Sequence, residues 1–368
     1  MILLRTLLLF SALIAWTLQS VAGAPVTVST TSGNLRGGRD GNVDAYLGIP
    51  YAKPPVGALR WRAPVKMDKW TGTRDASGFA ASCYQPWPPL HFGPYTPEFT
   101  DAPPPSEDCL YLNVWTPRAP GTRLPVLVWI HGGAFLTGSG AIEIYNGRHL
   151  ASQGVVVVTI NYRVGPFGFL ALPELTAESS HGGSGNYGLL DMIAALQWVR
   201  ENISAFGGSP EEVTIAGQSA GAAAVNDLLA SPAARGLFKR AVAESGSGMG
   251  FPALALKDAQ ADALAFAKYL GATTLAELRA LPPERLQEAV WIPIAGSGNE
   301  YTRPRVLFRP VLDHAVLAAD PEDPAAPVQS NVPLITGYNA DEGYDPGRTT
   351  SVADFERLVR ERYGVHAG

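Results

Sequence analysis

Ser219 lies at the centre of a Gly-Gln-Ser-Ala-Gly sequence at residues 217–221, a G-x-S-x-G pattern in which serine can act as a nucleophile. The pattern alone is weak evidence, because it arises often by chance. Here it follows the β-prone run Val213–Ala216 and precedes a run of small residues at 222–225 that suits the start of a helix. A strand, a sharp turn and a helix in that order predict a nucleophile elbow. The alternative is a serine that only caps a helix.

A pair of glycines, Gly132 and Gly133, follows the apolar run Val126–Ile130 and His131. A serine that attacks an ester produces a tetrahedral oxyanion, which preorganised N–H donors stabilise. Hydrolases with this elbow take one donor from the residue after the nucleophile and others from a glycine loop. We therefore expect Gly132, Gly133 and Ala220 to form an oxyanion hole, with His131 as a positioning residue rather than the general base. A plain strand-to-loop turn is the alternative for the glycines.

An acidic residue should follow a later strand, because the chain order in hydrolases with this elbow is Ser, then Asp or Glu, then His. Asp341 and Glu342 both follow the run Val332–Thr336. Either carboxylate could orient a general base, and a solvated acidic turn is the alternative.

Strands and helices alternate along the segment that must position these residues. Continuous apolar or β-branched runs at 126–130, 155–160, 213–216, 240–243 and 332–336 predict buried strands, and helical spacing appears at 187–206, 257–270 and 352–362. Alternation of this kind indicates the α/β class, with a mostly parallel central sheet and helices on both faces. Residues 25–64 are rich in glycine and short β-prone runs, which predict a small N-terminal antiparallel sheet.

Composition is that of a globular protein, since 46% of the 368 residues are hydrophobic and 17% are charged. The formal net charge of −5 and the lack of a basic run argue against nucleic acid as a partner. Residues 1–22 resemble a secretory signal peptide, with Arg5 before an apolar stretch and small residues after it. We expect residues 23–368 to form one domain, secreted or periplasmic and not held in a membrane after cleavage. An uncleaved membrane anchor is the alternative.

The chain has two cysteines, Cys83 and Cys109. In an oxidising compartment a disulfide is the natural interpretation, and it would close a Pro-rich loop that has little regular structure of its own. Two free buried thiols are the alternative. Two cysteines alone make a poor zinc site and no histidine pair has ligand spacing, so we expect neither a metal nor another cofactor.

Several further segments, together with the elbow and the glycine loop, resemble the type-B carboxylesterases, an α/β-hydrolase family that includes cholinesterases, bacterial para-nitrobenzyl esterases and fungal lipases. They lie at 46–57, 106–114, 161–163 and 185–191. The resemblance implies that Ser219 is the nucleophile, that Glu342 rather than Asp341 is the acid, and that Gly132, Gly133 and Ala220 are the oxyanion donors. It also implies a disulfide between Cys83 and Cys109, an ion pair between Arg60 and Glu107, and a hydrogen bond from Ser245 to the acid.

The general base has no good candidate within the chain. The resemblance implies a histidine on the order of a hundred residues after the acid, whereas the sequence ends at Gly368. His366 resembles a base loop only superficially, because residues 352–368 resemble the helix that follows the acid. The other histidines, His91, His131, His149, His181 and His314, precede Glu342. We therefore expect the base beyond residue 368, and a C-terminally incomplete chain of low activity.

The function that the sequence supports best is hydrolysis of small-molecule carboxylic esters through an acyl-enzyme intermediate. A non-catalytic binding protein on the same fold is the alternative. A lipase would need an apolar entrance, which aromatic residues at Trp87, Phe92, Tyr95 and Phe99 could line.

Overall fold

The computed structural model describes residues 24–87, 96–118, 121, 123–180, 182–246, 252–288, 308–321, 323, 325, 331–340, 342 and 351–363. Its strands are β1 (Val26–Ser29), β2 (Asn34–Asp40), β3 (Val43–Pro50), β4 (Thr73–Asp75), β5 (Ser82–Cys83), β6 (Pro105–Ser106), β7 (Tyr111–Pro117), β8 (Leu124–Ile130), β9 (Val156–Ile160), β10 (Gly208–Gln218), β11 (Arg240–Glu244), β12 (Leu254–Ala255), β13 (Val311–Leu312) and β14 (Leu334–Gly337). Its α-helices are α1 (Pro97–Thr100), α2 (Arg148–Ala151), α3 (Gly165–Phe169), α4 (Pro173–Glu178), α5 (Tyr187–Asn202), α6 (Ala220–Ala230), α7 (Leu256–Tyr269), α8 (Leu275–Ala280), α9 (Pro283–Glu288) and α10 (Val352–Tyr363).

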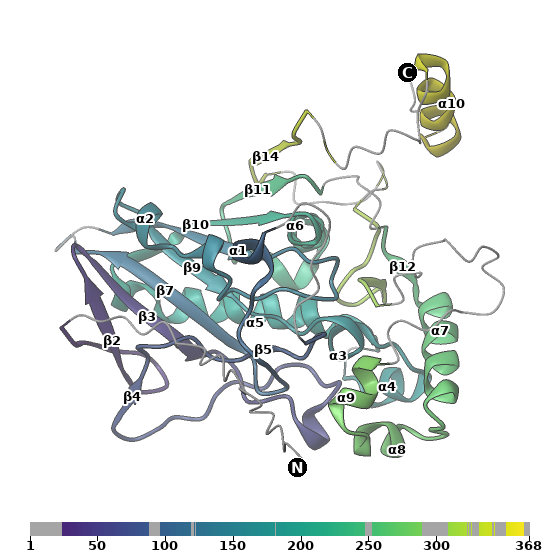
Figure 1. Ribbon diagram of the computed structural model, residues 1–368, viewed down its shortest axis with the longest axis horizontal. Helices are drawn as coiled ribbons and strands as arrows, with labels where there is room; N and C mark the ends of the chain where they lie inside the picture. The colour runs from purple at the N-terminus through teal and green to yellow at the C-terminus, as the bar shows by residue number, and fades with distance from the viewer. Residues whose placement is uncertain are drawn as a thin grey trace, which may run out of the picture.

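A twisted central sheet runs through the molecule in the order β1-β2-β3-β7-β9-β8-β10-β11-β14, with β4 beside β2 (Figure 1). Strands β9, β8, β10, β11 and β14 pair in parallel. The pairs β1–β2, β2–β3, β3–β7 and β7–β9 are antiparallel. The predicted α/β class is therefore confirmed. The N-terminal antiparallel part is continuous with the main sheet, because β3 pairs with β7.

Helices cover both faces of this sheet, as the alternating side chains of its strands require. On one face α5 and α6 pack against β10, and α6 also contacts β8 and β11. On the other face α2 packs against β3, β7 and β9. Strand β9 shows the division, since Val156 and Val158 belong to the main core while Val157 packs with Trp115 and Ala151 in a smaller cluster.

The carboxyl ends of the parallel strands meet at one edge of the sheet. In the register Ile130 of β8 lies beside Gly217 of β10, and Gly217 lies beside Ala243 of β11. Glu244 at the end of β11 lies beside Gly337 of β14. The loops that leave these strands carry the residues singled out from the sequence, so they begin next to one another. No helix within the described ranges is long and apolar enough to span a bilayer.

Candidate active site

Ser219 occupies the turn between β10 and α6, in a backbone conformation that non-glycine residues seldom adopt. Its φ is 57° and its ψ is −124°. The turn is held from both sides: the Ser219 amide donates to the Glu244 carbonyl at 2.9 Å, and the Ser219 carbonyl accepts from the Ala223 amide at 3.0 Å. The side chain is only partly buried. The geometry is that of a strained strand-to-helix turn that presents a serine at the carboxyl ends of the parallel strands.

Crowding explains the glycines around this turn. A Cβ at Gly221 would lie 2.1 Å from the Ile130 carbonyl oxygen, and one at Gly217 would lie 2.5 Å from the Gly221 carbonyl carbon. Gly246 is equally constrained, since a Cβ there would lie 2.2 Å from the Ser219 carbonyl oxygen. Side chains at these positions would push β8, β10 and α6 apart, so the spacing of the motif follows from close backbone packing.

The backbone of Gly132 lies directly against the serine. A Cβ at Gly132 would lie 2.7 Å from the Gln218 carbonyl oxygen and 3.2 Å from the Ser219 Cβ. Gly133 follows with a φ of 110°, and its carbonyl accepts the amides of Leu136 at 2.9 Å and Thr137 at 3.0 Å. These bonds close residues 133–137 into a compact turn. We call residues 131–138, which include this turn, the oxyanion loop.

Ala220 is the first residue of α6. The first amides of a helix have no acceptor within it, and they carry the positive end of its dipole. The Ala220 N–H therefore suits the binding of a negative oxygen beside Ser219. Of the three residues predicted as oxyanion donors, Gly132 thus lies against Ser219, Gly133 follows Gly132 in the chain, and Ala220 follows Ser219.

His131 is the buried first residue of the oxyanion loop. Its ring stacks on Tyr162 with the centroids 4.2 Å apart, and its Nδ1 lies 2.8 Å from the Gly132 carbonyl oxygen. The Tyr162 hydroxyl donates to the His131 carbonyl at 2.8 Å. Burial lowers the pKa of His131 to about 4, so the ring is neutral at pH 7 and its Nδ1–H can donate to Gly132. These contacts fit a positioning residue.

Glu342 lies where the chain leaves β14. Its Oε1 accepts the Ser245 hydroxyl, the Asn339 amide at 2.8 Å and the Asn339 side-chain Nδ2 at 3.1 Å. These bonds lower the pKa of Glu342, the Ser245 hydroxyl contributing most and the Asn339 amide next. Ser245 is fixed in turn, because its amide donates to the Gly337 carbonyl at 2.8 Å. The competing Asp341 lies outside the described residues.

A histidine partner for Ser219 does not appear among the described residues, where no imidazole is hydrogen bonded to the Ser219 Oγ. His149 in α2 and His314 are exposed. His91, His181 and His366 lie outside the described residues. The same part of the chain contains no group of three His, Cys, Asp or Glu side chains arranged to hold a metal ion.

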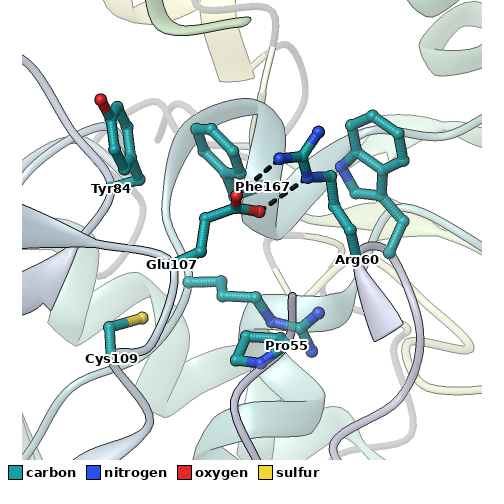
Figure 2. A pocket seen from close by; sticks show the side chains of 8 residues that line it. Pro55, Arg60, Tyr84, Glu107, Cys109 and Phe167 are labelled. Atoms are coloured by element: carbon teal, nitrogen blue, oxygen red, sulfur yellow. Dashed lines mark hydrogen bonds and ion pairs between the residues drawn. The ribbon is translucent and has the colours of Figure 1, made fainter. Parts of the chain in front are cut away.

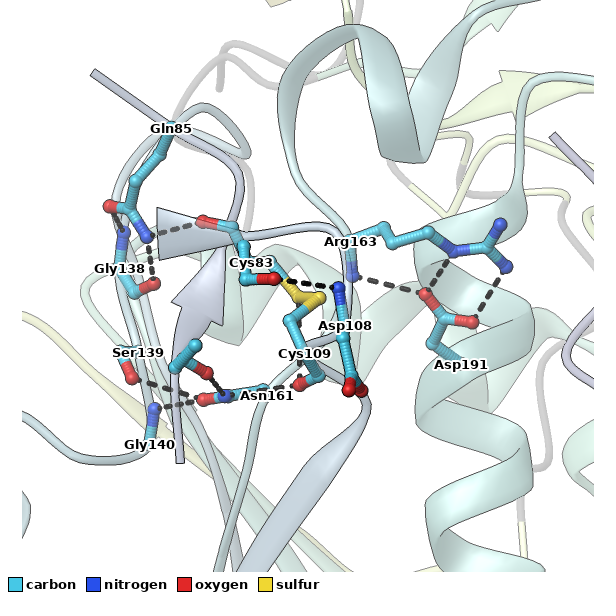
Figure 3. The surroundings of a disulfide bond; sticks show 12 residues. Cys83, Gln85, Asp108, Cys109, Gly138, Ser139, Gly140, Asn161, Arg163 and Asp191 are labelled. Carbon is cyan, nitrogen blue, oxygen red and sulfur yellow. Dashed lines mark hydrogen bonds and ion pairs between the residues drawn. A yellow bond between two sulfur atoms is a disulfide. The ribbon is translucent and has the colours of Figure 1, made fainter. Parts of the chain in front are cut away.

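The disulfide and the ion pair expected from the resemblance are both present. Cys83 and Cys109 are bonded and close a segment with a sequence separation of 26 (Figure 3). Arg60 donates to Glu107 through Nε at 2.6 Å and Nη2 at 2.5 Å, next to a small cavity of about 10 Å³ (Figure 2). The Arg60 Nη1 also donates to the carbonyls of Arg279 at 3.0 Å and Leu281 at 2.8 Å, where α8 ends. The sequence does not predict this second contact.

Asn161 and Arg163 are further residues to which the sequence analysis assigned no role, although both belong to a segment that carried the resemblance. The Asn161 side chain accepts the Gly140 amide at 2.9 Å and donates to the Cys109 carbonyl at 3.2 Å. Arg163 donates twice to the buried Asp191 carboxylate at 2.8 Å. A polar motif that follows a buried strand was the available signal for both.

Comparison with known proteins gives consistent matches. A model of the carboxylesterase family matches residues 24–355. A para-nitrobenzyl esterase of Bacillus subtilis (strain 168) is 43% identical over 322 residues, which cover 86% of this chain and 63% of that protein. A fumonisin B1 esterase of Sphingopyxis macrogoltabida is 42% identical over 369 residues, covering 96% of this chain and 65% of that protein. The chain thus spans slightly less than two thirds of the length of these two relatives.

Solved structures give the same result. A PNB esterase superposes with a TM-score of 0.76 at 40% identity, covering 91% of this chain and 68% of that chain. A thermophilic PNB esterase superposes with a TM-score of 0.77 at 40% identity and the same coverage.

Proposed function

We propose that this chain, which belongs to the carboxylesterase family, hydrolyses carboxylic esters of small molecules with Ser219 as its nucleophile. One observation carries the proposal: Ser219 has a φ of 57° in the turn after β10, and the Gly132 backbone lies against its Cβ. Such an arrangement presents a hydroxyl and places backbone amides where an oxyanion would form.

The proposed reaction has two steps. The Ser219 Oγ attacks the ester carbonyl carbon and loses its proton to a base, and the carbonyl oxygen becomes an oxyanion that the N–H groups of Gly132, Gly133 and Ala220 stabilise. The intermediate collapses, the C–O bond to the alkoxide breaks, and the protonated base gives its proton to the alkoxide oxygen, which leaves as the alcohol. Water then attacks the acyl-serine in the same way and releases the carboxylic acid.

We propose that Glu342 orients the base. Its hydrogen bonds with Ser245 and Asn339 favour the ionised carboxylate, and an ionised carboxylate can hold an imidazolium in place. Serine without an adjacent base is a weak nucleophile. Because no described histidine is bonded to Ser219, we expect the 368-residue chain to turn over slowly. Loss of a triad member costs on the order of 10⁴-fold in rate.

Hydrolysis of a short para-nitrophenyl ester by the purified 368-residue chain tests the proposal. We expect slow release of para-nitrophenol that Ser219→Ala abolishes, while Ser204→Ala at an exposed serine leaves it unchanged. Release that survives Ser219→Ala would overturn the proposal. Turnover at ordinary esterase rates that His366→Ala abolishes would instead identify His366 as the base and overturn the expectation of slow turnover.

A second candidate is a binding protein on the same fold, because a fold alone does not fix function. A binding protein would retain ester without cleaving it. Equilibrium binding of a non-hydrolysable amide analogue, with no acylation of Ser219 by the corresponding ester, would support this second candidate.

We also propose that the chain is exported. The signal-like segment 1–22 lies outside the described residues, and the Cys83–Cys109 disulfide supports export because disulfides persist mainly in oxidising compartments. Fractionation of the expressing cells with N-terminal sequencing tests this proposal. A cytosolic product that retains residues 1–22 would contradict it.

A further inference from the structure

Gln85 is a buried side chain that binds a distant backbone segment as a neighbouring strand would. It lies two residues after Cys83 and is 6% exposed. Its Oε1 accepts the Gly138 amide at 2.8 Å, and its Nε2 donates to the Gly138 carbonyl at 2.8 Å (Figure 3). The same Nε2 donates to the Cys83 carbonyl at 3.0 Å. One amide group therefore links the disulfide to the last residue of the oxyanion loop.

Gly138 lies directly against the start of that loop. Its φ is 112°, and a Cβ there would lie 2.3 Å from the His131 Nδ1 and 2.6 Å from the Gly132 carbonyl oxygen. Gly132 in turn lies against the Ser219 Cβ. A displacement of Gly138 would therefore move Gly132, which carries a proposed oxyanion donor, because the backbones of Gly138 and Gly132 are packed against each other.

Asn161 holds the next two residues in a similar way. Its Oδ1 accepts the Ser139 hydroxyl at 3.0 Å and the Gly140 amide at 2.9 Å. Its Nδ2 donates to the carbonyls of Ala81 at 3.0 Å and Cys109 at 3.2 Å. The side-chain amides of Gln85 and Asn161 thus bind three consecutive residues, 138–140. The same two amides also bind backbone carbonyls on both sides of the disulfide, namely those of Ala81, Cys83 and Cys109.

We propose that Gln85 is a positioning residue, which transmits the constraint of the Cys83–Cys109 disulfide through Gly138 to the oxyanion donors at Gly132 and Gly133. This inference rests on the proposed function of the oxyanion loop. Because Gln85 touches no reacting atom, its loss should lower kcat and leave KM nearly unchanged. Misplacement of a reacting group by about 1 Å can cost ~10²-fold in rate, and we expect a loss of about 10- to 100-fold.

Two variants test the proposal. Gln85→Met removes both hydrogen bonds to Gly138 at similar volume. Gln85→Glu is switchable: an ionised carboxylate would face the carbonyl oxygens of Gly138 and Cys83, whereas a protonated carboxyl can accept from the Gly138 amide and donate to its carbonyl as glutamine does. His131 is the titratable group that lies against Gly138. It stays neutral above its pKa of about 4, so its charge does not change between pH 5 and pH 8. Gln153→Glu and Gln153→Met at an exposed glutamine are the matched controls.

Amide hydrogen exchange supplies a readout that does not depend on activity. In Gln85→Met, and in Gln85→Glu at about pH 8, the amides of residues 132–138 should exchange at least ~10-fold faster than in the parent chain, with the sheet unchanged. Protection should return in Gln85→Glu near pH 5, and not in Gln85→Met. Unchanged protection of the loop, no recovery at low pH, or global unfolding of both variants would overturn the proposal.

Turnover of para-nitrophenyl acetate supplies the second readout. We expect kcat to fall in Gln85→Met, and in Gln85→Glu at about pH 8, and to recover near pH 5 only in Gln85→Glu, in parallel with the exchange protection. If the parent chain shows no Ser219-dependent turnover, the proposed function fails, while the exchange experiment still decides the role of Gln85. If turnover is present and kcat is insensitive to both Gln85 variants, the positioning role is excluded.

Discussion

Backbone strain at single residues is concentrated around Ser219. Among the described residues that are not glycine, positive φ occurs at Trp61, Ala134, Phe135, Ser219, Ser245 and His314. Four of these belong to the elbow, the oxyanion loop or the contact with Glu342. Each such residue costs about 1–3 kcal/mol and persists only where its surroundings enforce it. Ser219, the centre of the G-x-S-x-G motif, is thus also a position of backbone strain.

Gly221 provides a direct test of the crowding at the elbow. Gly221→Ala would place a Cβ 2.1 Å from the Ile130 carbonyl oxygen, whereas a Cβ at Gly78 meets nothing within 4 Å. We expect Gly221→Ala to lower the free energy of unfolding by about 1–3 kcal/mol or more, and Gly78→Ala to have little effect. Denaturant unfolding of both variants measures the difference. Equal effects would show that β8 and α6 do not approach as closely as described.

Ser245 should control the ionisation of Glu342, because the hydrogen bond from its hydroxyl makes the largest contribution to the lowered pKa of that carboxylate. A lowered pKa favours the folded protein above the pKa of the unfolded chain, and this contribution is lost as the pH falls through the folded pKa. Ser245→Ala should therefore raise the pKa of Glu342, so that the contribution disappears at a higher pH. Carbon-13 NMR titration of the glutamate carboxyls measures the shift. Ser351→Ala, next to Asp354, is the control, and an unchanged Glu342 titration in Ser245→Ala would contradict the assignment.

At the scale of elements, the sequence predicted the main strands and helices because each has its own periodicity. The apolar runs at 126–130 and 155–160 became β8 and β9, and the helical spacing at 187–206 became α5 followed by a 3-10 turn at Ile203–Phe206. β10 begins earlier than predicted, at Gly208, where its register with β8 shifts before Val213. Pairing with β8 extends a strand there that composition alone does not indicate.

The contacts between elements were less predictable, because they join residues far apart in the sequence. Gln85 and Gly138 are 53 residues apart, and Arg60 lies more than 200 residues before the carbonyls it binds at the end of α8. No local pattern specifies such a pair. The Ser219 elbow was predictable because its strand, turn and helix are contiguous, whereas the acid required a choice between two adjacent carboxylates.

The disulfide should make a measurable contribution to stability, because it closes a segment with a sequence separation of 26. Loop-closure entropy for such a segment corresponds to about 3–4 kcal/mol. We expect reduction to lower the free energy of unfolding by an amount of this order. The same reductant should leave the double variant Cys83→Ser/Cys109→Ser unchanged, since the chain has no other cysteine. Thermal unfolding with and without reductant measures both, and an equal effect on the two proteins would exclude the disulfide as the cause.

At the scale of the whole molecule, the centre of the central sheet differs in burial from one of its edges. The central strand β9 is buried along its length, whereas β14 forms an edge of the described sheet and is exposed along its length. Leu334 is 42% exposed and Ile335 is 70% exposed. An exposed apolar edge strand is a template for pairing with another chain.

Self-association through β14 is therefore expected of the purified 368-residue chain. Ile335→Lys would place a charge on the exposed edge and should weaken association by about tenfold, equivalent to about 1.4 kcal/mol. Val65→Lys, at a residue that is 40% exposed and lies outside β14, is the control. Light scattering over a concentration series measures the effect. Association that is reduced equally by both substitutions would argue against β14 as the contact.

Reaction with a fluorophosphonate probe tests the central claim most directly, because the probe requires both a reactive serine and donors for the phosphoryl oxygen. The folded 368-residue chain should be modified at Ser219 alone after prolonged incubation, as identified by peptide mass spectrometry. Ser219→Ala should abolish the modification, and Gln85→Met should slow it. A folded chain that remains unmodified, or that is modified at another serine, would contradict the assignment of Ser219 as the nucleophile.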